Sequence, residues 1–249
     1  MTLSYNGSAF CGWQRQKNDP SVQGTLENAL SMLLGEKIEV IGAGRTDTLV
    51  NARGYVAHFD CGQGNSEVIG GTSMSLDMLR YKLNAVLPRE IAVEAIKPAS
   101  DDFHARFSAV RRQYQYFIHQ EKDPFRDAFS WYCRFHLDID RMNRACTYLL
   151  GTHDCSCFEK TGSDNATSIC TIMAASWRVS GDNCLTFTIE ANRFLRNMVR
   201  AVVGTTVDIG RGVHEPEYIL ELLEKGTRSD AGQSVPGHAL FLSGIFYQK

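Results

Sequence analysis

Residues 21–35, SVQGTLENALSMLLG, predict an amphipathic helix near the start of the chain. Apolar side chains recur there every three or four positions, which places them on one face of a helix. These residues are Val22, Leu26, Leu30, Leu33 and Leu34. Ser21 is a typical N-cap and Gly35 is a typical helix stop, so both ends of the predicted helix are marked.

Short apolar segments surround this helix and are predicted to be strands. They cover residues 2–5, 38–41, 55–60 and 91–96. A second helix has apolar residues at helical spacing from Leu76 to Leu87 and ends at Pro88. Residues 62–75 are rich in Gly and Ser and are predicted to form a surface loop. The predicted order, β-α-β-β-α-β, is that of a ferredoxin-like unit.

The rest of the chain repeats this order with additions. Strands are predicted over residues 113–119, 130–134, 169–179, 184–190 and 240–247. Helices are predicted over residues 141–150, from Asn192 onward and from Pro216 to the residue before Gly226, with a polar loop over 161–167. We therefore predict an α+β fold of two ferredoxin-like halves, residues 1–104 and 105–249. Their mainly antiparallel sheets are expected to adjoin and to leave a central active-site cleft.

The composition is that of an ordinary globular protein, because hydrophobic residues make up 43% and charged residues 22% of the chain. No apolar run approaches the ~20 residues of a membrane span, and the N-terminus lacks the pattern of a signal peptide. A cytoplasmic protein without a membrane segment is therefore expected. The net charge of −2 argues against a uniformly basic nucleic-acid binder, although it allows a local basic cleft.

The eight cysteines are scattered along the chain, and no pair has C-x-x-C spacing. Cys155 and Cys157 are two positions apart with His153 nearby, but a zinc site would need further ligands at recognisable spacing. We therefore expect reduced thiols and no metal. These spacings count against one alternative function, that of a Cys-based metal or redox protein.

The segment GAGRTDT, residues 42–48, follows a predicted strand directly and is the first candidate site. Its glycines allow a sharp turn and a close approach to a ligand, and Arg45 and Asp47 are spaced to face the same cleft. The alternative is a hairpin turn in which Asp47 caps backbone N–H groups. A nucleotide phosphate loop is not supported, because the segment has no lysine and lacks the pattern of such loops.

Three arginines, Arg193, Arg196 and Arg200, form the second candidate site. On a helix beginning near Asn192 they would span about 60° of the circumference, opposite an apolar face. Such a stripe could bind phosphate or pair with a buried carboxylate. The alternative is a plain solvent-exposed face.

The segment RRQYQY, residues 111–116, places Tyr114 and Tyr116 on one face of a predicted strand behind two arginines. Aromatic side chains on a sheet beside basic residues are typical of sites that stack an unstacked base. The alternative is a pair of core tyrosines with solvated arginines next to them.

Several ordered motifs together resemble the TruA-type tRNA pseudouridine synthases across nearly the whole chain. The matching segments are YNGSAFCGWQRQ at 5–16, SVQ at 21–23, GRTD at 44–47, FHARFSA at 103–109 with Tyr114 and Tyr116, LLGTHD at 149–154 and NRFLRNMVR at 192–200. A series of motifs in one order is far more specific than any single motif.

The resemblance implies an isomerase without cofactor or metal that converts uridine to pseudouridine at positions 38, 39 and 40 of the tRNA anticodon stem-loop. It also implies a homodimer that binds tRNA. Asp47 corresponds to the catalytic aspartate, and Tyr114 to the residue that stacks on the target base. Arg200 would pair with the aspartate, and Arg45 would flip or hold the nucleotide. Arg193 and Arg196 then remain as candidate phosphate-binding groups.

Two positions after Asp47 depart from the family pattern, because Leu49 stands where a Gly is usual and Asn51 where a His is usual. If that Gly adopts a positive φ, Leu49 would cost about 1–2 kcal/mol or reshape the loop. The main alternative function is therefore a catalytically impaired homologue that binds or folds RNA. The presence of Asp47, Tyr114 and Arg200 together favours the enzyme, because a pure RNA-binding module has no use for a carboxylate facing phosphates.

Overall fold

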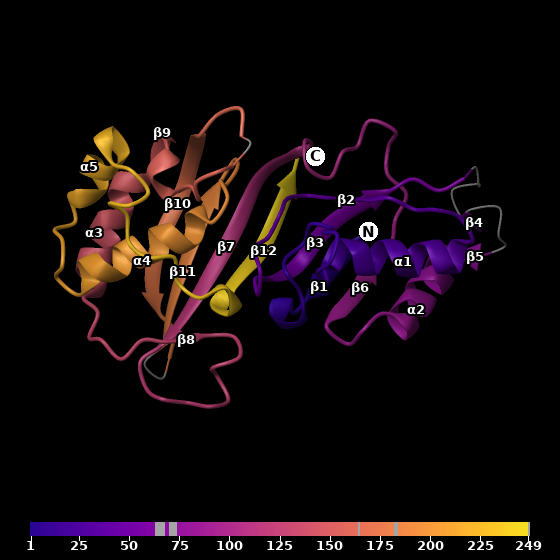
Figure 1. Cartoon of the computed structure of the whole chain (residues 1–249), viewed down its shortest axis with the longest axis horizontal. Coiled ribbons are helices and arrows are strands. Elements are labelled where there is room, and N and C mark those ends of the chain that lie inside the picture. The colour runs from indigo at the N-terminus through magenta and orange to yellow at the C-terminus, as the bar shows by residue number, and fades with distance from the viewer. Residues whose placement is uncertain (63–67, 70–73, 164, 182–183, 249) are drawn as a thin grey trace. The chain divides into compact units, whose positions relative to one another are not determined.

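The computed structural model describes residues 1–62, 68–69, 74–163, 165–181 and 184–248 (Figure 1). The chain divides into two compact units. The first consists of Met1–Val110 and Leu242–Lys249, and the second of Arg111–Phe241. The first unit therefore includes a segment that follows the second unit in the sequence.

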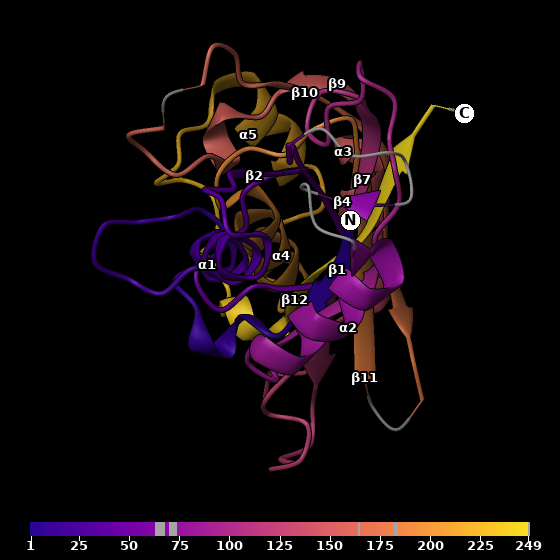
Figure 2. The same ribbon diagram turned by 90° about the vertical axis from the view of Figure 1, so that its right-hand side faces the viewer.

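In the sheet of the first unit, β1 lies between β6 and β3 and is antiparallel to both, β2 is antiparallel to β3, and β12 is a further neighbour of β3. The strands are β1 (Thr2–Tyr5), β2 (Val40–Gly42), β3 (Asn51–Phe59), β6 (Ile91–Ala95) and β12 (Leu240–Tyr247). Helices α1 (Val22–Leu34) and α2 (Leu76–Val86) pack beside each other, as Figure 2 shows. The described part of the unit also contains a short 3-10 helix, η1 (Gly7–Ala9).

The predicted helix of residues 21–35 is confirmed with both of its ends. The Ser21 side chain accepts a hydrogen bond from the Gly24 N–H, and Gly35 ends α1 with a φ of 73°. Leu26 and Leu30 are fully buried, as their stripe predicts. Burial of each such side chain stabilises the fold by about 1.5–3 kcal/mol.

The loop predicted over residues 62–75 lies mostly outside the described residues, which omit 63–67 and 70–73. Two described pieces of it, β4 (Val68–Ile69) and β5 (Met74–Ser75), form an antiparallel pair. The polar loop predicted over 161–167 contains neither helix nor strand among its described residues, and residue 164 lies outside them.

The second unit has an antiparallel sheet in the order β7-β11-β10-β9, and β8 pairs with β7 in parallel. Its strands are β7 (Ala109–His119), β8 (Trp131–Tyr132), β9 (Gly151–Asp154), β10 (Ile169–Val179) and β11 (Cys184–Ala191). Its helices are α3 (Ile139–Leu149), α4 (Met198–Gly210) and α5 (Tyr218–Lys225), with 3-10 helices η2 (Ser156–Phe158) and η3 (Gly237–Ala239). In the described residues, none of the helices is long and apolar enough to cross a membrane.

The helix predicted from Asn192 begins later, at Met198, and that prediction was wrong in its start. The Asn192 side chain accepts hydrogen bonds from the backbone N–H groups of Thr171 and Arg193, which fixes this segment to β10 in a non-helical form. Asn197 then adopts a left-handed conformation with a φ of 65°. Regular helix cannot continue backward through such a residue.

Candidate active site

The loop that carries Asp47 follows β2 and has its backbone fixed by aromatic residues of the first unit. The Tyr55 hydroxyl donates to the Gly44 carbonyl. The Tyr5 hydroxyl lies 2.8 Å from Oγ1 of buried Thr46. The Trp13 backbone N–H donates to the Thr46 carbonyl at 3.2 Å, and the Trp13 and Tyr55 rings stack with centroids 4.2 Å apart. Asp47 is half-buried, and it directly follows the residues that these contacts fix.

Two glycines from the N-terminal motif let the chain approach this loop from the other side. A Cβ at Gly12, which has a φ of 93°, would clash with the Thr46 carbonyl oxygen. A Cβ at Gly7 would clash with the backbone of Leu49 and Val50. Both positions therefore require glycine for close backbone packing, which explains how the YNGSAFCGWQ segment serves the GRTD loop.

Asn51 and Leu49, the two departures from the family pattern, have distinct structural roles. Asn51 is only 2% exposed, and its Oδ1 accepts a hydrogen bond of 2.9 Å from the Gly7 N–H. Leu49 has a φ of 68°, in the region that favours glycine. The Leu49 backbone is held there by its own N–H, which donates to the Phe10 carbonyl at 3.4 Å. The loop thus has a left-handed turn at Leu49, where the backbone of this residue is strained.

We expect Leu49→Gly to be more stable than Leu49→Ala by about 1 kcal/mol, because only the alanine keeps a Cβ in the left-handed region. The two variants lose the same leucine side chain, so their difference isolates the backbone. Urea unfolding measures it. The same pair at Met32, an exposed position inside α1, should show the opposite order, since glycine costs about 1 kcal/mol in a helix. An alanine variant more stable than the glycine variant at Leu49 would contradict the strained turn.

Arg45 lies in the same loop as Asp47 with an exposed side chain. Its Nε donates a hydrogen bond of 3.1 Å to Oε1 of Gln14, from the GWQ segment. The sequence places Gln14 in a family motif but gives no sign of its role. A contact between residues this far apart in the chain could not be found without the fold.

Tyr114 lies on β7 in the second unit and is half-buried. Its ring meets Phe194 edge to face, with centroids 5.1 Å apart. Phe194 precedes α4 and is flanked in sequence by Arg193 and Leu195. The structure therefore brings Tyr114 next to the segment that carries the arginines. Tyr116, by contrast, is fully buried and donates its hydroxyl to the Pro236 carbonyl at 3.0 Å.

The three arginines do not share one helix face, contrary to the prediction from their spacing. Only Arg200 lies in α4, where its Nε donates to the Val235 carbonyl at 2.6 Å. Arg193 and Arg196 precede the helix, half-buried and exposed respectively. The left-handed Asn197 separates Arg193 and Arg196 from the helix.

The predicted site residues thus fall into two groups, each within one unit. Arg45 and Asp47 belong to the first unit, whereas Tyr114 and the arginines Arg193, Arg196 and Arg200 belong to the second. The pairing of Arg200 with Asp47 stays a prediction.

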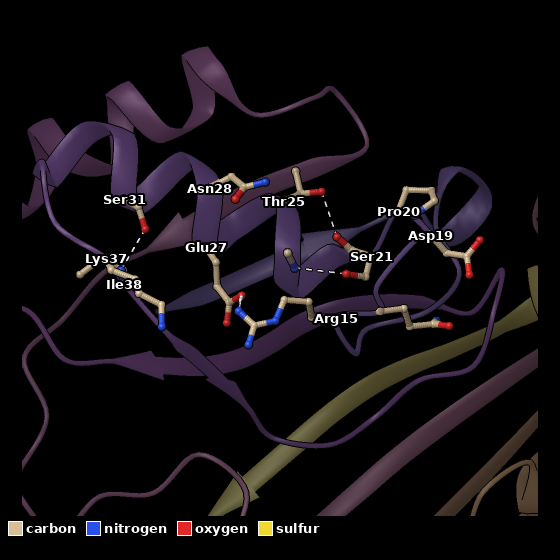
Figure 3. A pocket seen from close by; sticks show the side chains of 12 residues that line it. Arg15, Asp19, Pro20, Ser21, Thr25, Glu27, Asn28, Ser31, Lys37 and Ile38 are labelled. Atoms are coloured by element: carbon tan, nitrogen blue, oxygen red, sulfur yellow. Dashed lines mark hydrogen bonds and ion pairs between the residues drawn. The ribbon is translucent and has the colours of Figure 1, made fainter.

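Two hollows lie away from these residues. One, of about 330 Å³, runs along α1 and is lined by residues such as Arg15, Glu27 and Lys37 (Figure 3). The other, of about 570 Å³, lies in the second unit beside residues 121–126 and includes His119. Neither of these two hollows is lined by Asp47 or Tyr114.

Comparison with known proteins gives a consistent result. A family model described as tRNA pseudouridine synthase matches residues 1–108 and 145–248. The protein named tRNA pseudouridine synthase A from Parabacteroides distasonis is 43% identical over 245 residues, covering 98% of this chain and 94% of the relative. The protein of the same name from Bacillus subtilis is 38% identical over 252 residues, covering 99% and 97%. The segments matched by the family model contain Asp47 and Arg200 but not Tyr114.

Proposed function

Because the chain belongs to the tRNA pseudouridine synthase family, it is an isomerase of tRNA uridine, and we propose that it acts on uridines 38, 39 and 40 of the anticodon stem-loop. We propose Asp47 as the catalytic carboxylate. The support is the loop that carries it, which is fixed by Trp13 and Tyr55 on one side and by Gly7 and Gly12 on the other. Such preorganisation is what a catalytic group requires.

The chemistry of the reaction suits a carboxylate. Pseudouridine forms when the N1–C1′ bond breaks, the uracil turns, and C5 joins C1′ with loss of the C5 proton. A carboxylate can assist by attacking the sugar or the base, or by removing the C2′ proton. The reaction is a rearrangement within one nucleotide, with no net oxidation, so we propose that it proceeds without cofactor or metal.

The remaining roles concern the target nucleotide, which must leave the base stack at a cost of a few kcal/mol. We propose that Tyr114 stacks on the flipped base and that Arg45 holds the nucleotide. In this proposal Arg200 pairs with Asp47 as a group of opposite charge. Arg193 and Arg196 contact phosphate. The edge-to-face contact of Tyr114 with Phe194 supports this division of roles, because it fixes the ring beside the arginine segment.

We further propose that each unit is a ferredoxin-like half and that the two units correspond to the two predicted domains, except that Leu242–Lys249 belongs to the first unit. The first unit supports this by its element order β1-α1-β2-β3-α2-β6 and by a sheet in which β1 and β3 are central between β6 and β2. A homodimer in the cytoplasm remains our expectation for the assembled enzyme.

Tritium release from tRNA that carries 5-labelled uridine tests the proposed function, because the C5 hydrogen leaves only when pseudouridine forms. We expect release from substrates with uridine at positions 38, 39 or 40, and none when all three are replaced. Tight tRNA binding without release would instead support the impaired RNA-binding homologue.

Arg193→Ala is expected to weaken tRNA binding, because this arginine is proposed to neutralise a phosphate of the substrate. The slope of log K against log salt should fall by about one unit for each phosphate that the variant no longer neutralises. Binding titrations over a range of salt concentrations measure this slope. Arg144→Ala serves as a matched control. Arg144 lies on α3, and its guanidinium already pairs with the Glu217 carboxylate at 3.0 Å. An unchanged slope for Arg193→Ala would assign that arginine to ordinary solvent exposure.

A further inference from the structure

A chain of side-chain hydrogen bonds leads from the interior of the first unit to Arg45. Glu27 of α1 is only 5% exposed and accepts a hydrogen bond from Nε2 of Gln23 at 3.2 Å. Oε1 of Gln23 in turn accepts from Nε2 of Gln14 at 2.8 Å. Oε1 of Gln14 accepts from Nε of Arg45 at 3.1 Å. We name Glu27, Gln23, Gln14 and Arg45 the amide relay.

The amide relay has only one consistent arrangement, because the groups at its ends cannot exchange donor and acceptor roles. At Gln23, the Glu27 carboxylate and the Val40 carbonyl only accept, so they draw Nε2, while the Arg15 backbone N–H only donates and draws Oε1. The Gln14 amide must then present Nε2 to Gln23. This leaves Oε1 of Gln14 for a guanidinium, which only donates.

The anchor of the amide relay is itself fixed. Both oxygens of Glu27 accept hydrogen bonds, Oε1 from the Val40 N–H at 3.1 Å and Oε2 from Arg15 at 2.8 Å. Figure 3 shows the Arg15 side chain reaching Glu27 beside α1. A buried carboxylate held in this way has a defined position. The hydrogen bonds of the two amides then fix the Arg45 side chain, in the loop of Asp47, relative to this carboxylate.

Arg45 is the member that needs such support. Its side chain is long, exposed and rich in rotamers, so an unsupported guanidinium would sample many positions. A substrate-binding group acts best when it is held in place before the substrate arrives. The sequence motifs GWQ and SVQ contribute one glutamine each to this support, and the motifs alone indicate no role for either glutamine.

We propose that Gln14 and Gln23 are positioning residues that hold the Arg45 guanidinium for the substrate nucleotide, with buried Glu27 as their anchor. This proposal rests on the proposed function through the role of Arg45. Gln14 acts through Arg45 and does not itself touch the reacting atoms.

Gln14→Leu tests the proposal, since leucine is similar in size and cannot form either hydrogen bond. We expect kcat/KM for tRNA to fall about tenfold, the effect of losing one hydrogen bond to a charged group. In an Arg45→Ala background the same change should have no further effect, because there is no guanidinium left to position. Gln16→Leu is the matched control and should leave kcat/KM unchanged, because the Gln16 amide donates to the Cys11 carbonyl of its own loop and, among the described residues, takes no part in the amide relay.

A second measurement separates the amide relay from the proposed function. The Nε–H resonance of Arg45, assigned by its absence in Arg45→Lys, should be protected from solvent exchange in the wild type and in Gln16→Leu but not in Gln14→Leu. This readout does not require turnover. An enzyme that makes no pseudouridine but shows this pattern would refute the proposed function and not the positioning of Arg45. An equal fall in kcat/KM from Gln14→Leu with and without Arg45, or a resonance unaffected by Gln14→Leu, would overturn the amide relay.

Discussion

Asp47→Asn is expected to abolish pseudouridine formation while changing tRNA affinity by less than about twofold. The amide has the shape of the carboxylate, so the Asp47 loop and its supports from Tyr5, Trp13 and Tyr55 should remain in place. It can serve neither as a nucleophile nor as a base, so the whole contribution of the carboxylate to the rate is lost. Single-turnover tritium release and a binding titration on the same preparation measure the two effects.

The control for this prediction is Asp60→Asn, which changes an exposed carboxylate just after β3 in the same unit. It should leave both turnover and tRNA binding as in the wild type. Clear residual pseudouridine formation by Asp47→Asn would remove Asp47 from its proposed catalytic role. A large loss of tRNA affinity in the same variant would show that the carboxylate helps to bind the substrate, contrary to our expectation.

Tyr114→Ala is expected to lose almost all turnover, whereas Tyr114→Phe should keep a measurable part of it. Stacking of a base on an aromatic ring contributes about 1–3 kcal/mol, so alanine should weaken binding of the flipped base tenfold or more. Phenylalanine keeps the stacking face and the edge-to-face contact with Phe194. Single-turnover rates, measured with saturating enzyme, separate this effect from general tRNA binding.

The hydroxyl of Tyr114 offers a second role, since some group must accept the proton that C5 loses. If Tyr114→Phe is as inactive as Tyr114→Ala while both bind tRNA, the hydroxyl is the chemical group and stacking is secondary. If both variants keep the full rate, Tyr114 is only a packing residue of β7. Tyr148→Ala, on α3 in the same unit, is the control for removal of a half-buried tyrosine.

The elements that the sequence predicted best are those whose ends are chemically marked. Strand β11 begins at its predicted residue, Cys184, and α1 has its predicted caps, because alternating burial and capping residues act locally. The predicted start of α4 was wrong, because Arg193 and Arg196 have helical spacing in the sequence although they precede the helix. The side chain of Asn192 fixes this segment in a non-helical form, because it accepts a hydrogen bond from a backbone N–H of β10, about twenty residues away in sequence.

For the site, the sequence motifs predicted that Arg45 and Asp47 lie on one loop, but not which contacts fix the backbone of that loop. The contact between Gln14 and Arg45 joins residues 31 positions apart, and no periodic pattern encodes it. The positive φ of Leu49 was anticipated only because the family has glycine there. A leucine seen alone gives no sign of a left-handed turn.

The return of the last segment, Leu242–Lys249, to the first unit has a consequence for synthesis of the protein. During translation, residues 1–110 leave the ribosome long before β12 exists, so β3 at first lacks the neighbour with which it finally pairs. An unpaired strand edge is a template for association with other chains. The nascent first unit therefore passes through an aggregation-prone stage, which lasts until β12 has been made and pairs with β3.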